Sequence, residues 1–221
     1  LDRLETRRAF NAAALAGQTA PELDLNAALP AADLEAMAYR TVRAVGTFVF
    51  EEEVALRNQV YLGRPAFRLI TPLRLAGSDA VILVDRGYVP ADRFTPGDRE
   101  TFASPAGEVL VSGIIRISHT EPDIGNRGDP TSAPGEALLV WNLVNVEEIA
   151  RQVTGPVLPV YIQQGPGGTA RSGGNGLPAA SIFIPELTEG PHLGYAIQWF
   201  LFAGILWVGY PFFLLKEARR E

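Results

Sequence analysis

Apolar residues form one long uninterrupted run near the C-terminal end of the chain, at positions 193–215 (LGYAIQWFLFAGILWVGYPFFLL). These 23 residues include no charged side chain, and Gln198 is their one amide. As an α-helix the run would be about 35 Å long, enough to cross a hydrocarbon core of about 30 Å with modest tilt. The pattern predicts a membrane-spanning helix over 191–215, followed by a basic tail at 216–221.

Charged residues flank this predicted span unequally. Lys216, Arg219 and Arg220 follow it, whereas Glu186 and Glu189 precede it. Basic residues are enriched on the cytoplasmic side of membrane helices. We therefore expect the tail in the cytoplasm and the main domain on the extracytoplasmic side of the membrane.

Before the span, between positions 39 and 190, the apolar pattern has a period of two over several short stretches, which is typical of β-strands. Turn-forming stretches such as 76–79 and 95–98 separate them. The predicted strands are 39–50, 66–75, 80–86, 108–117, 137–143 and 158–163. This spacing predicts an α+β fold, in which an antiparallel sheet or partial β-barrel has helices flanking it.

Three helical segments accompany the predicted strands. Two of them, 1–17 and 30–37, lie in an N-terminal helical segment at 1–38, and Asn145 is placed to cap a third that runs through Val153. The glycine-rich stretch 165–176 reads as a loop, because it lacks the Gly-Lys-Ser/Thr ending of a phosphate cradle and no helix follows it.

Two further side-chain positions have structural interpretations. Arg86 and Gly87 are expected to end a strand in a tight turn, and Trp141 is expected to pack in the core.

The amino-acid composition excludes several kinds of site and partner. The chain has no Cys and one Met, which excludes disulfides, zinc ribbons, iron–sulfur sites and thiolate copper sites. Its net charge of −6 makes the chain a poor candidate for binding a nucleic acid, whose phosphates are also negative. His119 with Asp123 and a nearby Ser could suggest a hydrolase, but there is no Gly-x-Ser-x-Gly motif. We predict no catalytic residue.

One face of the predicted C-terminal helix is distinctive. His192, Tyr195, Trp199 and Leu206 follow each other at helical steps, with the small Ala203 between them. Two interpretations are open. The aromatic residues could lie at the level of the lipid headgroups, where Tyr and Trp are common. Alternatively, this face could contact another helix or a cofactor, since a neutral imidazole is the usual axial ligand of haem iron.

Five stretches of the chain together resemble the Surfeit locus (Surf/Shy-type) family of cytochrome c oxidase assembly factors. They occur in the family's order and cover nearly the whole chain. They are 1–8 (LDRLETRR), 63–73 (GRPAFRLITPL), 84–90 (VDRGYVP), 141–163 with its LPVYIQ strand, and 191–200 (PHLGYAIQWF).

The resemblance implies a non-enzymatic protein of the bacterial plasma (inner) membrane, with a first membrane span preceding position 1. It implies a role in maturing the haem–copper oxidase core subunit, by assisting haem a insertion. Its expected partners are that subunit, haem-synthesis proteins and membrane lipid. His192 matches the family's haem-contacting histidine, so it is the expected metal ligand, with Tyr195 and Trp199 beside it at the cofactor. The alternative is an accessory protein-interaction module of the oxidase that does not bind haem.

Overall fold

The computed structural model describes residues 2–29, 33–98, 101–103, 106–118, 120, 129, 137–169, 176–180 and 192–217. The chain divides into two compact units. One unit is Ala13–Pro185, and the other combines Leu1–Ala12 with Glu186–Glu221. The β-structure lies in the first unit and the long C-terminal helix in the second.

The helices and strands follow one another in this order. They are α1 (Asp2–Thr19), β1 (Leu23–Asp24), α2 (Leu25–Ala28), the 3-10 helix η1 (Glu35–Met37), β2 (Thr41–Phe48), the 3-10 helix η2 (Phe50–Glu52), β3 (Val54–Tyr61), β4 (Arg64–Leu75), β5 (Val81–Pro90), the 3-10 helix η3 (Ala91–Arg93), β6 (Val109–Ile117), β7 (Val140–Trp141), α3 (Val146–Ala150), β8 (Val157–Gly168) and α4 (His192–Glu217).

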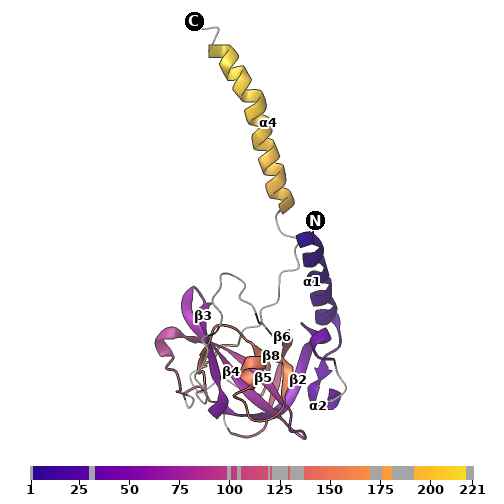
Figure 1. Ribbon diagram of the computed structural model, residues 1–221, viewed down its shortest axis with the longest axis vertical. Helices are drawn as coiled ribbons and strands as arrows, with labels where there is room; N and C mark the ends of the chain where they lie inside the picture. Colours follow the sequence, from indigo (N-terminus) through magenta and orange to yellow (C-terminus); the bar gives the residue numbers. More distant parts are fainter. Residues whose placement is uncertain are drawn as a thin grey trace. The chain divides into compact units, whose positions relative to one another are not determined.

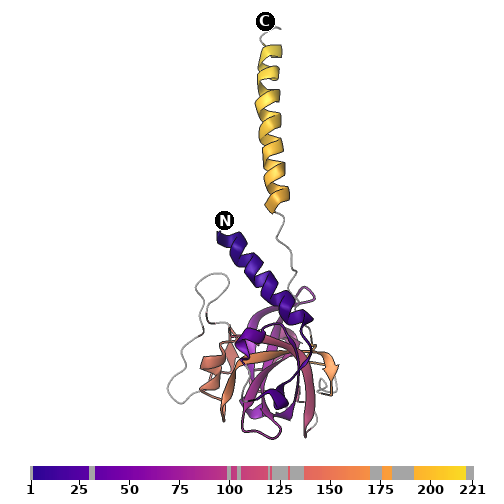
Figure 2. The same ribbon diagram turned by 90° about the vertical axis from the view of Figure 1, so that its right-hand side faces the viewer.

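Five strands close into a barrel in the order β2-β6-β8-β5-β4, with β4 pairing back to β2 (Figure 1). The 90° view in Figure 2 shows the same strands enclosing one interior. The predicted α+β fold is confirmed, and the barrel is closed. The expectation of an antiparallel sheet is wrong where β5 pairs with β8, because that pair is parallel. The chain crosses from β5 to β8 through β6, β7 and α3, a connection long enough to bring a strand back in the same direction.

The alternation of side chains along β2 explains how the sequence specifies the barrel wall. Val42 and Ala44 are buried in the interior, whereas Arg43 between them is exposed. Gly46 allows β2 to approach β4 closely, because a Cβ at this position would lie 2.2 Å from the backbone oxygen of Arg74. The period-two pattern predicted from the sequence is confirmed here.

The barrel interior is filled by apolar side chains from all five strands, and α2 adds to it. Leu25 of α2 and Leu34 are buried in the same cluster as the strand residues. Asp24 caps α2 by accepting a hydrogen bond from the backbone N–H of Ala27 at 3.3 Å. This local cap therefore fixes the helix that delivers Leu25 into the core.

A second apolar cluster lies between the sheet and α3. It includes Trp141, which is buried and donates its indole N–H to the carbonyl of Leu138 at 2.8 Å. Asn145 caps α3 by accepting the backbone N–H of Glu148 at 3.2 Å. The predicted cap and the predicted core position of Trp141 are both confirmed.

Two strands were not predicted, the two-residue β1 and the longer β3. β3 begins directly after Glu53, and its pairing with β4 contains an irregularity between Leu56 and Gln59. Asn58 in this irregularity has a positive φ of 61°. The irregularity interrupts the period of two, so the apolar pattern of the sequence does not reveal a strand.

Several predicted boundaries also differ. The helix expected to run through Val153 is shorter, because α3 ends at Ala150. β7 is shorter than the strand expected at 137–143, whereas β8 continues through Gly168 into the stretch expected to be a loop. Of the helix expected at 30–37, only η1 is present among the described residues, and 30–32 lie outside them. The ends of such short segments depend on pairing with distant strands, so the local apolar pattern predicts them poorly.

α4 confirms a helix over the apolar run of the sequence (Figure 1). Within the part of the chain that the structure describes, no helix combines the length and the hydropathy that a membrane span requires. The predicted span over 191–215 is therefore not confirmed and stays a prediction.

Candidate functional site

α4 brings the three predicted site positions onto one face. His192 is its first residue, and Tyr195 and Trp199 follow at steps of three and four residues. At about 3.6 residues per turn, such steps place side chains along one side of a helix. The side chain of His192 lies outside the described part of the chain, so its role as a ligand stays a prediction.

The two aromatic residues of this face are exposed. Tyr195 is 58% exposed and Trp199 is 70% exposed. The ring of Trp199 packs edge to face against Phe202, with ring centroids 6.2 Å apart and planes at 82°. The face continues along the helix to Leu206 and Tyr210, which are also exposed. We call the face formed by positions 192, 195, 199, 203, 206 and 210 the α4 stripe.

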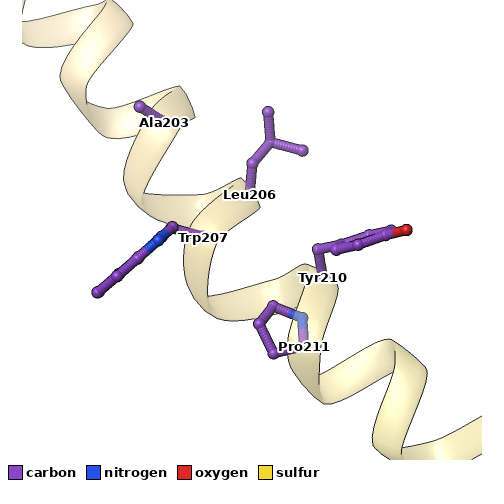
Figure 3. Close-up of a pocket in the computed structure, with 5 residues that line it drawn as sticks. All are labelled: Ala203, Leu206, Trp207, Tyr210 and Pro211. Atoms are coloured by element: carbon purple, nitrogen blue, oxygen red, sulfur yellow. The ribbon is translucent and has the colours of Figure 1, made fainter.

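A shallow depression lies on the C-terminal half of the α4 stripe. Figure 3 shows Leu206 between Ala203 and Tyr210 along the helix, with Trp207 projecting to the other side from Tyr210. Pro211 completes the lining, and because proline has no N–H it cannot donate to the carbonyl of Trp207. The surface is apolar with a low point at Ala203, a shape that accepts a flat apolar group or the ridge of another helix.

The barrel holds a buried ion pair that the sequence interpretation missed. Arg86 of β5 donates from Nη1 to the Glu53 carboxylate at 2.9 Å, and both side chains are under a tenth exposed. The Thr71 hydroxyl donates to the same carboxylate oxygen at 2.5 Å, and Arg86 Nη2 donates to the carbonyl of Phe102. The predicted tight turn at Arg86 is therefore wrong, because β5 continues through Pro90 and Arg86 points into the protein.

The Arg86 guanidinium is stabilised by its surroundings despite its burial. Its central carbon, Cζ, lies 5.3 Å and 5.0 Å from the ring centroids of Phe48 and Phe50. Burial lowers the pKa of Arg86, and the charge and hydrogen bond of Glu53 oppose that shift. Arginine stays protonated at any physiological pH. The pair therefore acts as a fixed charge pair that ties β5, β4 and the start of β3 together.

Asp85, the neighbour of Arg86, has a partner on the opposite side of the sheet. Successive residues of a strand point to opposite faces. The Asp85 carboxylate forms an ion pair with Arg68 of β4, and Asp85 is 1% exposed. Two consecutive charged residues in the otherwise apolar sequence of β5 are the signal that could have revealed both pairs, because buried charges are nearly always paired.

The described residues contain no cluster of three or more potential metal ligands. His119 lies outside them. An imidazole is a common axial ligand of haem iron, and an apolar surface can pack against the haem ring. The α4 stripe offers that donor type at position 192 and an apolar aromatic surface beyond it, so its residues fit one side of such a group.

A family model described as the SURF1 family matches residues 1–204 of the chain. The chain belongs to the SURF1 family. The matched range contains the whole barrel and positions 192, 195 and 199 of the α4 stripe. The family resemblance inferred from the sequence motifs is thereby confirmed.

Individual relatives agree with this assignment. An uncharacterized SURF1-like protein of Mycobacterium tuberculosis is 29% identical over 205 residues, covering 90% of this chain and 69% of that protein. A SURF1-like protein of Monosiga brevicollis is 28% identical over 212 residues, covering 88% of this chain and 74% of the relative. Surfeit locus protein 1 of Xenopus tropicalis is 27% identical over 133 residues, covering 60% of this chain and 39% of its own length.

Proposed function

We propose that this SURF1-family chain is a membrane-anchored assembly factor for haem–copper cytochrome c oxidase. In this role it assists the insertion of haem a into the core subunit of the oxidase and acts without catalysing a reaction. Its partners are that subunit, the proteins that make haem a, and membrane lipid. The observation that carries the proposal is the α4 stripe, an exposed apolar face that begins at His192.

The chemistry of the α4 stripe supports haem as its ligand. Neutral imidazole is a strong ligand for haem iron. Tyr195 and Trp199 provide exposed rings on the same face, and Ala203 leaves room beside them. Bound haem would supply the iron that His192 ligates, and these residues would orient and cover its ring.

The placement in a membrane rests on the sequence of the same helix. The run 193–215 contains no charged residue, and Lys216 follows it directly. This arrangement favours α4 as an anchor in the bacterial plasma membrane, with the barrel on the extracytoplasmic side. An apolar face exposed on a helix in lipid costs little and stays available to a ligand that partitions into the membrane.

The test is absorption spectroscopy of the full chain, expressed in bacterial membranes together with the enzymes of haem a synthesis. We expect the purified wild type to carry haem and His192→Ala to lose it. Leu201→Ala, on the opposite side of α4 from the stripe, is the control that should retain haem. No haem in the wild type, or equal binding by His192→Ala, would contradict the haem-binding role.

A second candidate is an accessory module that binds oxidase subunits and no haem. It is favoured by the hairpin between β3 and β4, where Val60 and Leu62 are 68% and 83% exposed. Between them, Tyr61 stacks on Tyr88 with ring centroids 4.9 Å apart, which holds the hairpin in place. Co-purification of a haem-free wild type with the oxidase core, abolished by Val60→Ser with Leu62→Ser, would select this candidate.

A further inference from the structure

The hairpin between β3 and β4 turns through two residues, Leu62 and Gly63, because Tyr61 and Arg64 pair directly across it. Both turn residues have a positive φ, 50° for Leu62 and 75° for Gly63. A turn of this kind favours Asn or Gly at its first position, since a bulky side chain is strained in the left-handed region. The turn geometry alone therefore does not explain a leucine at position 62.

The core does not explain this leucine either. Leu62 is 83% exposed, and Val60, two residues earlier, is 68% exposed. A single exposed apolar side chain is ordinary on a protein surface. Here, however, two of them are neighbours on one turn, and one is held in an unfavourable backbone conformation. We call residues Val60 to Leu62 the hairpin tip, and its composition indicates a contact with something outside the chain.

The hairpin is basic, although the whole chain is acidic. Positions 54–75 contain no Asp or Glu, whereas the chain as a whole has a net charge of −6. The charged residues of the hairpin are Arg57, Arg64, Arg68 and Arg74. Arg57 precedes the hairpin tip on β3 and Arg64 follows it on β4, so a positive charge flanks the apolar tip on each strand.

Both flanking arginines can still bind a negative group from outside. The side chain of Arg64 is 73% exposed, and its contact with Asp92 is long, at 3.7 Å, between two exposed groups. Exposed pairs of this kind contribute little. Arg57 Nε donates to the neutral side-chain oxygen of Asn142 at 2.7 Å, which leaves the charge of Arg57 uncompensated by that contact.

An apolar tip with basic flanks fits a lipid surface better than a protein surface. A stable protein interface buries about 800 Å² on each partner, much more than two aliphatic side chains supply. Attachment to a membrane surface instead combines a few apolar side chains at the acyl boundary with basic side chains at anionic headgroups. Tyr61, half-buried between the two aliphatic residues, belongs to a residue type that is common at that level of the bilayer.

We propose that the hairpin tip inserts Val60 and Leu62 into the surface of a membrane, where Arg64 and Arg57 contact the phosphates of anionic lipids. The proposal rests on the membrane placement given under the proposed function, and it does not depend on haem binding. It assigns to the barrel unit a contact with lipid that is separate from α4.

The test places a fluorescent label on the hairpin tip. The chain has no Cys, so Leu62→Cys provides a single attachment point for the environment-sensitive fluorophore NBD. The full chain is reconstituted into vesicles of phosphatidylcholine and phosphatidylglycerol. We expect a blue-shifted emission that lipids with a doxyl group on the acyl chain quench.

The matched control is Ser78→Cys, in the exposed turn at the other end of β4. The same label there should keep its emission in water and should not be quenched by the doxyl lipids. If the label at position 62 behaves like the label at position 78, the proposal is overturned, and a protein partner is left as the explanation of the exposed tip.

A third label position, Leu201→Cys in α4, separates this proposal from membrane anchoring. Lipid quenching at position 201 with none at position 62 would overturn hairpin insertion while the anchor stands. Lipid quenching at position 62 with none at position 201 would support the hairpin and contradict the anchor.

Charge variants then test the contact with anionic lipid, each with the label at position 62. Arg64→Gln should lower the ratio of lipid-inserted to water-exposed label about fivefold, the factor for one basic residue near an anionic surface. Arg74→Gln, at the exposed far end of β4, removes the same charge and should be quenched like the unsubstituted hairpin. Equal effects of the two variants would overturn the specific role of Arg64.

Val60→Asp checks that the side chains of the chain, and not the label, drive insertion. It places a negative charge in the hairpin tip and should abolish lipid quenching at position 62. Unchanged quenching in Val60→Asp would overturn the proposal, because the label would then enter the lipid without the tip.

Discussion

The barrel and α4 use similar apolar residues in opposite ways. In the barrel, apolar side chains fill one interior, and even charged residues such as Arg86 are buried against a partner. On α4, Trp199, Leu206 and Trp207 are mostly exposed. In the barrel this apolar content stabilises the fold, whereas the proposed function gives the apolar residues of α4 a binding role. Substitutions should therefore affect stability in the barrel and binding on α4.

The largest effect on stability is expected from the buried ion pair. Arg86→Met removes the partner of Glu53 and leaves a carboxylate buried without a counter-charge. We expect the free energy of unfolding to fall by about 3–5 kcal/mol. The measurement is urea unfolding followed by the fluorescence of Trp141, in a background with phenylalanine at positions 199 and 207.

The control for this variant is Arg93→Met, at the exposed position of η3, which should change the free energy of unfolding by less than about 0.5 kcal/mol. If Arg86→Met costs no more than this control, the barrel does not depend on the pair. The barrel would then not differ from the exposed helix α4 in its dependence on buried charge pairs.

Glycine-to-alanine substitutions compare the packing of the two regions directly. A Cβ at Gly113 of β6 would lie 2.2 Å from the backbone oxygen of Gln163, whereas a Cβ at Gly204 of α4 has nothing within 4 Å. Gly113→Ala should therefore destabilise the barrel by about 1–3 kcal/mol, as in other overpacked cores.

Gly204→Ala should leave barrel unfolding unchanged and should raise the helicity of α4, because alanine favours a helix over glycine by up to about 1 kcal/mol. Circular dichroism and urea unfolding measure both effects. A loss of α4 helicity in Gly204→Ala would mean that this position is closely packed, and α4 would then not differ from the barrel in its packing.

Sequence patterns revealed the parts of the molecule that depend on local chemistry. The alternation of Val42 and Ala44, the cap at Asn145 and the apolar helix of α4 were all predicted. The β5–β8 pairing and the burial of Arg86 were not, because each depends on residues far away in the chain. Glu53 illustrates the limit, since its neighbours Glu51 and Glu52 suggest a solvated acidic turn while its own side chain is buried.

The charged and aromatic positions discussed above also differ in whether the local sequence predicts their arrangement. The spacing of His192, Tyr195 and Trp199 predicted their common helix face from local geometry alone. The pairing of Asp85 with Arg68 depends on strand order, which a single sequence does not specify.

We expect a smaller effect on stability from the N-terminal cap of α3, the helix that packs on the sheet. Asn145→Ala removes the side-chain cap of α3, whose first turn then has an unsatisfied backbone N–H at Glu148. We expect a loss of about 1 kcal/mol in the free energy of unfolding. Asn145→Ser, which can still cap, should recover most of it. An unchanged stability in Asn145→Ala would show that packing of Trp141 alone fixes α3.

The central claim is that the α4 stripe performs the function and the barrel supports it, and two identical substitutions on α4 test it most directly. Leu206 lies on the stripe, whereas Leu201 lies on the opposite side of the helix, about 180° from His192 at 100° per residue. The measurement is the haem a content of cytochrome c oxidase purified from cells whose own copy of this gene is replaced by each variant. The account predicts less haem a per core subunit with Leu206→Ala and wild-type content with Leu201→Ala, at equal amounts of folded chain. Equal haem a content with the two variants would contradict it.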